Sequence, residues 1–282
     1  MGYEFPRTMV GGVSVSRMII GSNWILGYSH TSSAMDKVIK HTNGSAQAIA
    51  SLLSAYMEQG VDTFMAPFKG ETKTLEAIKM TEEKFGRKMI LVDTPVINVD
   101  DTAQARKEAE ATIKASKDLG ATFCFPHHTS VEQLMNKNKQ AIPRLPDYLS
   151  MIRENGMIPG LSAHMPECVV YSDMNNYDVE TYIQLYNCLG FLMQVEVEYI
   201  NNVIQNAKKP VMTIKSMAAG RCTPFVGLNF SWATIRECDM VTVGCMTPHE
   251  AWECIEISRA AFERRKANLE GRSSPKKTEI MK

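Results

Sequence analysis

Short apolar runs alternate with amphipathic segments along most of this chain. Eight of the runs have the length and the continuous hydrophobicity of strands that are buried on both faces. These strands are expected near residues 17–22, 61–67, 88–96, 121–127, 157–163, 191–199, 210–217 and 240–245. Helical periodicity is found near residues 44–58, 71–85, 102–118, 143–155, 178–189, 200–207, 227–237 and 248–266. This alternation predicts a parallel sheet whose strands are linked by helices.

The repeated pattern favours a single (β/α)₈ TIM barrel of the α/β class. A barrel of this kind takes about 250 residues, and the chain has 282. Residues 6–15 surround Gly11 and Gly12 and indicate a β-hairpin before the first strand. We therefore expect one barrel domain over residues 1–266 with an N-terminal hairpin cap, followed by a disordered tail at 267–282.

Helix-start signals and long connections refine this picture. Ser45 precedes one helical pattern, and Thr247 and Glu250 have the spacing of a capping box before the last one. Two long connections, 23–43 and 128–142, follow the first and fourth expected strands. Both lie on the C-terminal face of a barrel, where long loops commonly shape a substrate site.

Composition narrows the class of partner and the compartment. Basic and acidic residues number 31 each, so the net charge gives no support to binding of nucleic acid or anionic membranes. The seven cysteines form no CxxC pair, and the N-terminal residues contain no apolar signal segment. We expect a cytoplasmic protein that acts on a small molecule, with no membrane or nucleic-acid partner. Its oligomeric state stays open, a homo-oligomer included.

Chemically capable residues stand at the ends of several expected strands. His127 and His128 end the fourth strand, and His164 ends the fifth. Glu196 lies on the expected sixth strand, and Lys215 lies on the seventh. Because a barrel gathers the C-terminal ends of its strands into one mouth, these side chains are expected to share a pocket.

A metal site is the first chemical hypothesis for this mouth. Imidazoles and carboxylates from His128, His164, Glu196 and Asp93 suit Zn²⁺, Mn²⁺ or Fe²⁺. Carboxylates inside a barrel need a cation, because an unpaired buried charge is costly. The alternative is therefore an ion-pair network with Lys215 and no metal.

Catalytic roles follow from the same placement. Glu196 or His127 would move a proton, and Lys215 would hold a developing oxyanion. A lysine whose pKa is lowered by burial is also a Schiff-base nucleophile, and the remaining alternative is an ion pair with Glu196 or Glu198.

Substrate and anion sites are expected in the surrounding loops. Trp24 and His30 lie in a loop whose aromatic and hydroxyl groups suit a sugar-like substrate. Glu198 and Arg221 are further candidates for substrate contacts. The loops at 218–221 and 244–247 offer backbone N–H groups to an anion.

Five segments together resemble the aldo-keto reductase superfamily over most of residues 6–265. They are Val15–Ser22, Gly60–Phe64, Gly160–Glu167, Gln194–Glu196 and Ile214–Gly220. The resemblance implies a (β/α)₈ barrel capped by a hairpin, with an NAD(P) cofactor. It places Ser162 and Gln194 at the nicotinamide carboxamide, and the loops that contain Gly220 and Gly244 at the cofactor phosphates.

The residues that carry the family's reaction are mostly replaced. Met65 stands at the position of the family's aspartate, Gly70 at that of its tyrosine, and the 93–95 region at that of its lysine. Only the histidine has a counterpart, His127. This departure favours a metal-assisted lyase, isomerase or hydrolase that acts on a small sugar-like or carbonyl metabolite. An NAD(P)H-dependent reductase and a non-catalytic ligand-binding barrel are the alternatives.

Overall fold

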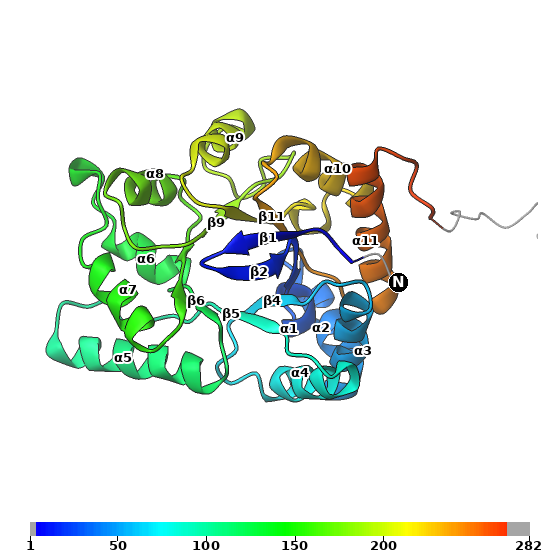
Figure 1. The fold of residues 1–282 in the computed structure, drawn as a ribbon, viewed down its shortest axis with the longest axis horizontal. Coiled ribbons are helices and arrows are strands. Elements are labelled where there is room, and N and C mark those ends of the chain that lie inside the picture. Colours follow the sequence, from blue (N-terminus) through cyan, green and yellow to red (C-terminus); the bar gives the residue numbers. More distant parts are fainter. Residues whose placement is uncertain (1–3, 270–282) are drawn as a thin grey trace, which may run out of the picture.

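A β-hairpin begins the part of the chain that the computed structural model describes, residues 4–269, and leads into a barrel (Figure 1). Strand β1 (Arg7–Val10) pairs antiparallel with β2 (Val13–Ser16). Gly11 and Gly12 form the turn with φ of +55° and +82°, a left-handed conformation that suits glycine. A Cβ atom on Gly11 would lie 2.7 Å from Ile158 Cγ2, so the hairpin turn rests against the start of the fifth barrel strand.

Within the described residues, nine short parallel strands form the barrel in the order β7–β6–β5–β4–β3–β11–β10–β9–β8. Their bounds are β3 Met18–Gly21, β4 Thr63–Ala66, β5 Ile90–Asp93, β6 Phe123–Cys124, β7 Ile158–Pro159, β8 Leu161–Ser162, β9 Tyr182–Leu185, β10 Val211–Ile214 and β11 Met240–Val243. Only Gly160 separates β7 from β8, and β7 pairs with β6 whereas β8 pairs with β9. The two therefore share the fifth of eight strand positions, which confirms the predicted (β/α)₈ architecture with its hairpin.

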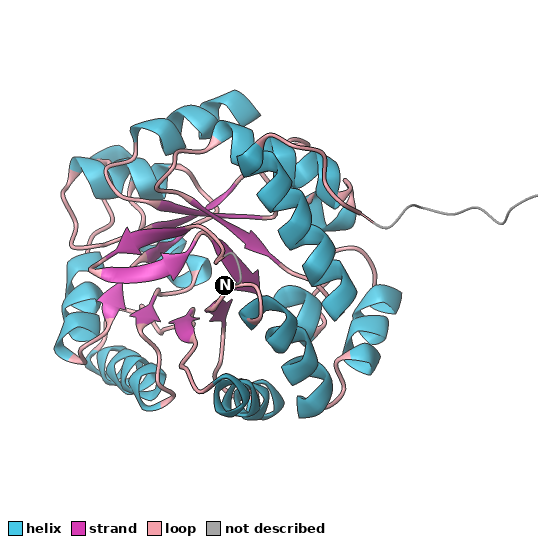
Figure 2. Cartoon of the chain, turned by 45° about the vertical axis from the view of Figure 1, so that its right-hand side comes forward, coloured by secondary structure: helices cyan, strands magenta, loops and turns pink. Residues whose placement is uncertain are grey.

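Helices surround the strands and cover the outer face of the barrel (Figure 2). Their bounds are α1 Asn23–Leu26, α2 Ser33–Thr42, α3 Ala46–Met57, α4 Thr72–Phe85, α5 Ala103–Asp118, α6 His128–Leu134, α7 Leu145–Glu154, α8 Glu167–Met174, α9 Val197–Asn206, α10 Pro224–Thr234 and α11 Pro248–Glu263. Ser45 caps α3, and Thr247 and Glu250 form the predicted capping box. Nowhere in residues 4–269 does a helix combine the length and the apolar character that a membrane crossing requires.

The prediction for the sixth strand is wrong. That strand is β9, within the segment 178–189 that the periodicity assigns to a helix. Residues 191–199 are instead a loop and the first turn of α9. Over residues 193–198, apolar side chains that are half-buried against the core alternate with exposed polar ones. The alternation that suggests a strand therefore comes from a loop that lies along the surface of the molecule.

The two long connections contain helices that the pattern does not predict. Helices α1 and α2 occupy much of 23–43, and α6 and a short 3₁₀ turn (Lys137–Lys139) occupy much of 128–142. Both connections still lie on the C-terminal side of the strands, as expected. Of the predicted tail, residues 270–282 lie outside the described residues.

We expect Gly160→Ala to destabilise the fold. An ideal Cβ on Gly160 would lie 2.2 Å from Cε1 of Phe125, whose side chain is fully buried inside the barrel. Overpacking of this kind costs roughly 1–3 kcal/mol, and chemical denaturation should show the free energy of unfolding lowered by about that amount. In a Phe125→Leu background the same substitution should cost less, because leucine removes the clashing ring edge. An unchanged denaturation midpoint in the wild-type background would contradict this packing.

Candidate active site at the barrel mouth

A cavity of about 820 Å³ opens at the C-terminal ends of the barrel strands. Loops after most of the strands contribute to its wall. Its polar lining includes His30, His127, His128, Ser162, His164, Lys215 and Glu250. The structure thus brings together the three strand-end histidines and Lys215, which are the residues that the sequence analysis places in one mouth.

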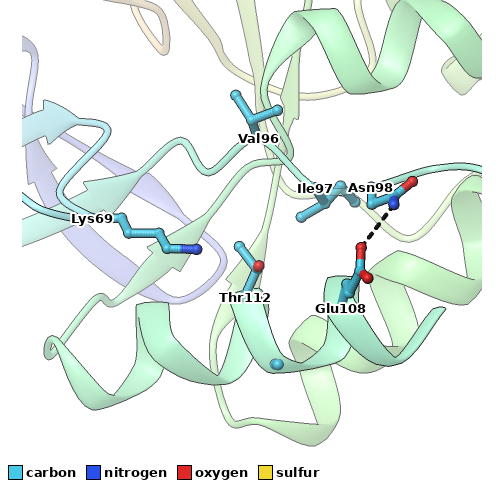
Figure 3. A pocket seen from close by; sticks show the side chains of 7 residues that line it. Lys69, Val96, Ile97, Asn98, Glu108 and Thr112 are labelled. Carbon is cyan, nitrogen blue, oxygen red and sulfur yellow. Dashed lines mark hydrogen bonds between the residues drawn. The ribbon is translucent and has the colours of Figure 1, made fainter. Parts of the chain in front are cut away.

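A second hollow lies outside the mouth, between α5 and the loops that follow β4 and β5 (Figure 3). It has a volume of about 530 Å³, and Lys69, Asn98 and Glu108 are among its lining residues. Asn98 Nδ2 donates a hydrogen bond to Glu108 Oε2 at 2.8 Å. No imidazole lines this hollow within the described chain, so the candidate chemistry lies in the barrel mouth.

Two histidines and one glutamate form a compact group in the mouth, the His–Glu–His cluster of His128, Glu132 and His164. One ligand-type atom from each residue lies within 4.8 Å of the others. His128 Nδ1 is 3.6 Å from Glu132 Oε2, and all three side chains are half-buried. These are the residue types and separations from which a divalent metal site can be assembled.

Helix α6 and the end of β8 place the cluster. His128 and Glu132 stand four residues apart on α6, so they share one face of that helix. Glu132 Oε1 accepts hydrogen bonds from the backbone N–H groups of His164, at 2.7 Å, and Met165, at 3.1 Å. The carboxylate therefore ties α6 to the segment that follows β8. His127, directly before the helix, is its N-cap, and its Nδ1 lies 2.9 Å from Thr129 Oγ1.

Burial lowers the pKa of two histidines in or beside this cluster. The pKa values of His127 and His164 are each lowered to about 4, first by burial and then by the charge of His128. Burial alone would raise the pKa of Glu132, but the nearby imidazole of His128 and the backbone hydrogen bonds from His164 and Met165 outweigh it and lower the pKa. An ionised Glu132 carboxylate beside the neutral imidazole of His164 is the protonation state in which these two residues bind a metal.

The imidazole rings are stacked and one nitrogen lacks a partner. The ring centroids of His128 and His164 are 3.6 Å apart, and the planes are inclined by 18°. His128 Nδ1 is buried and makes no hydrogen bond. Because each nitrogen lone pair lies in the plane of its ring, one ring must turn before both can bind the same ion.

Lys215 contributes an amine without a counter-ion. In residues 4–269 its Nζ forms neither a hydrogen bond nor an ion pair, and burial lowers its pKa to about 8. Its charge contributes to the lowered pKa values of His30 and His164. The ion pair with Glu196 or Glu198, one alternative for this lysine, is therefore not formed.

The loops after β3 and β10 form the other side of the mouth. Asn23 Nδ2 lies 3.1 Å from His30 Nε2, and an Arg221 guanidinium nitrogen donates to His30 O at 3.1 Å. Trp24 packs beside Gly220 and Gly244, where ideal Cβ atoms would lie 3.5 and 3.4 Å from the indole ring. These contacts place the expected substrate residues Trp24, His30 and Arg221 at the cavity wall.

Two backbone N–H groups of the anion site expected at the start of α11 already donate hydrogen bonds within the chain. Glu250 Oε2 accepts hydrogen bonds from the N–H groups of Met246, at 2.6 Å, and Thr247, at 3.2 Å. A carboxylate thus occupies the backbone donors that the sequence analysis offers to an anion. It also brings negative charge to this end of the cavity.

Four predicted site residues lie outside the cavity wall. Gln194, Glu196 and Glu198 are exposed, in or next to the loop that the pattern presents as a strand. Asp93 is fully buried, and its Oδ1 accepts a hydrogen bond from Phe68 N–H at 3.0 Å. Burial raises the pKa of Asp93. None of the four is in the His–Glu–His cluster.

Two residues of interest were not predicted. Glu132 lies four positions after His128, a spacing that would have marked it as a ligand if a helix had been expected at 128. Gln184 is the glutamine that the true sixth strand carries; it is fully buried, and its Oε1 has no hydrogen-bond partner. The resemblance points to Gln194 for the nicotinamide carboxamide only because the predicted sixth strand is misplaced.

Comparison with known proteins identifies the fold. No family model and no curated protein matches the sequence. A structure provisionally assigned as an aldo-keto reductase from Pseudomonas aeruginosa is similar with a TM-score of 0.64 and 13% identity, over 91% of this chain and 96% of that one. An aldo/keto reductase from Klebsiella pneumoniae, in complex with NADP and acetate, gives 0.53 and 12% over 94% and 92%.

The fold is shared with other enzymes as well. A truncated 3-deoxy-D-arabino-heptulosonate 7-phosphate synthase from Thermotoga maritima gives a TM-score of 0.53 at 12% identity, over 93% of this chain and 92% of that one. Identities of this size establish the fold alone. The predicted resemblance to the aldo-keto reductases is therefore confirmed at the level of the barrel, and the chain has a fold that several classes of enzyme use.

We expect Lys215→Met to raise the free energy of unfolding at pH 7. Burial lowers the pKa of Lys215 from 10.5 to about 8, so the folded protein loses stability as the pH falls between these values. Below pH 8 the loss is complete and amounts to at most about 3 kcal/mol. Denaturant titrations at pH 7 and pH 10.5 should show a gain that is largest at pH 7.

The matched control is Lys69→Met, since Lys69 is exposed and unpaired within the described residues. It should leave the free energy of unfolding nearly unchanged at both pH values. Equal effects of the two substitutions would contradict the burial of an unpaired ammonium at position 215.

Proposed function

We propose that this protein is a metal-dependent enzyme that acts on a small polar metabolite, with His128, Glu132 and His164 as the metal ligands. The observation that carries the proposal is the His–Glu–His cluster at the mouth of a (β/α)₈ barrel, where enzymes of this fold have their active sites. We assign the reaction to the lyase, isomerase or hydrolase class, on a sugar-like or carbonyl substrate.

The donor set fits a first-row divalent ion. Two imidazoles and one carboxylate suit Zn²⁺, Mn²⁺ or Fe²⁺ and leave a position open for a substrate oxygen or water. Ligand atoms around zinc lie roughly 3.3 Å apart, given bonds of about 2.0–2.1 Å. The 3.6 Å between His128 Nδ1 and Glu132 Oε2 is close to this value, and a turn of the His164 ring would bring in the third ligand.

Glu132 takes the place that the sequence analysis gave to Glu196 and Asp93. When bound, the metal would polarise a carbonyl or hydroxyl oxygen of the substrate. His127, whose low pKa keeps it neutral, is available beside the cluster to accept a proton, since its ring centroid lies 4.2 Å from that of His128. Lys215 provides positive charge for a developing oxyanion across the same cavity.

Elemental analysis of the purified, untagged protein tests the ligand set. We expect close to one equivalent of Zn, Mn or Fe per chain, removed by dialysis against a chelator and restored by the metal. His164→Ala and Glu132→Gln should each lower the affinity at least tenfold, because each removes or neutralises a ligand. Isothermal titration of the apo-protein with the metal alone measures this loss.

His41→Ala is the control, because His41 is exposed on α2 and belongs to no cluster of ligand-type residues in the described chain. It should bind metal as the wild type does. A protein that contains no metal and takes none up on reconstitution would reduce the cluster to a structural pairing of Glu132 with its neighbours.

An NAD(P)-dependent oxidoreductase is the second candidate. One observation favours it: the cavity runs from the mouth past Ser162 to the loops at Gly220 and Gly244, where the resemblance places the cofactor. The similar Klebsiella pneumoniae structure contains NADP. The Glu250 carboxylate weighs against it, because it already pairs the backbone donors at the start of α11.

Titration with NADPH separates the two candidates. If the metal-dependent function is right, NADPH fluorescence should neither shift nor gain intensity at micromolar protein. Saturable binding that Ser162→Ala or Gly244→Val abolishes would instead favour the oxidoreductase.

A further inference from the structure

We propose that Lys215 is a nucleophilic amine that forms an imine with an aldehyde or ketone substrate. The inference rests on the position of this side chain: it lines the mouth cavity and, within residues 4–269, has neither a carboxylate partner nor a hydrogen bond. The imine itself does not depend on the metal site.

A structural role would require a partner, and residues 4–269 give Lys215 none. Removing an ammonium from water costs several kcal/mol unless a counter-charge repays it. The two carboxylates on or beside the cavity are engaged elsewhere, Glu132 with the N–H groups of residues 164 and 165 and Glu250 with those of 246 and 247. Burial alone lowers the pKa of Lys215, with no contribution from an acid. Asp36 and Glu132 act on the neighbouring imidazoles of His30 and His164 instead.

The backbone at this position is held in an unusual conformation. Lys215 has φ of +66°, Ala218 and Ala219 also have positive φ, and Lys215 O accepts a hydrogen bond from Ala218 N–H at 2.7 Å. A left-handed conformation is unfavourable for a non-glycine residue, because its Cβ approaches the following carbonyl oxygen. Strain of this kind persists where the surroundings over-determine the geometry, and it is concentrated at functional sites.

The chemistry balances with the lysine and solvent. Lys215 first loses one ammonium proton to solvent, and the neutral amine nitrogen bonds to the carbonyl carbon. The carbonyl oxygen then takes one proton from the nitrogen and one from solvent and leaves as water. A protonated imine remains on Lys215. The Ser216 hydroxyl lies in the same cavity, is buried and has no hydrogen-bond partner within residues 4–269, so it is placed to relay a proton from solvent. Burial, which favours the neutral amine, supports the first step.

The imine would narrow the reaction class. A protonated imine withdraws electrons from the adjacent carbon and so assists cleavage of a C–H or C–C bond there, which is isomerase or lyase chemistry. This choice of reaction class rests on the proposed function. Of the three classes proposed there, it excludes hydrolysis. The substrate class is then a small aldehyde or ketone with a second oxygen that the metal can hold.

Reductive trapping tests the proposal on the full chain. The protein is incubated with dihydroxyacetone, and in a parallel sample with pyruvate, then reduced with sodium borohydride and mapped by peptide mass spectrometry. With at least one probe, we expect label on Lys215 at least ten times that on Lys69, an exposed lysine beside another hollow. Lys215→Arg, which keeps the charge, should abolish this label, and Lys69→Arg should leave it unchanged.

Two further samples make the outcome decisive. Lys215→Met should be folded by circular dichroism and also unlabelled, which excludes loss of label through misfolding. Trapping is repeated on chelator-treated protein: label that survives without metal supports the imine whatever the fate of the metal site. Labelling spread over exposed lysines, or no label on Lys215 with either probe, overturns the proposal, and measured metal content then still decides the metal-dependent function separately.

Discussion

The mouth of this barrel depends on one carboxylate. Glu132 faces His128 on its own helix and accepts hydrogen bonds from two backbone N–H groups of the segment that follows β8. It thereby fixes imidazoles from two different β/α units side by side. Because its hydrogen bonds are charge-assisted and half-buried, each is stronger than a neutral one. The same carboxylate therefore fixes the position of α6, the course of the chain after β8 and the candidate metal site.

The sequence was informative about the fold wherever burial alone decides the structure. Seven of the eight predicted strands contain a barrel strand or the pair β7 and β8, because strands buried on both faces are continuous apolar runs. The sixth predicted strand is misplaced because the true one, β9, contains Gln184, a fully buried polar residue that interrupts its apolar run. Meanwhile the surface loop at 191–199 alternates its apolar and polar side chains with the period of a strand. Periodicity reports which side chains are covered, and it does not say whether a sheet or a neighbouring surface covers them.

The site was predictable only in part, for a related reason. His127, His128, His164 and Lys215 stand just after strands whose ends are clear, so barrel geometry alone places them in the mouth. Glu132 requires knowledge that α6 begins at 128, within a segment without a marked apolar stripe. Asp93 ends its strand as expected, yet it pairs with Phe68 N–H and does not reach the cavity. The position of a residue along its strand predicts how close it lies to the mouth of the barrel. Its local hydrogen bonds decide whether its side chain points into the cavity.

The balance of charge in the mouth points to the kind of group that it recognises. Glu132 and Glu250 both accept hydrogen bonds from backbone N–H groups, and the imidazoles of His127 and His164 are neutral. The ammonium of Lys215 has no partner in the described part of the chain. Negative charge is therefore lacking beside Lys215 within the described residues, although Glu250 supplies it elsewhere at the cavity wall, and a metal ion on the His–Glu–His cluster would enlarge this deficit. An electron-rich substrate oxygen relieves this deficit, and a nearby cation also favours the neutral form of the lysine amine. A carbonyl compound with an adjacent oxygen meets both requirements, because one oxygen can neutralise the cationic side of the mouth while the carbonyl carbon accepts the amine.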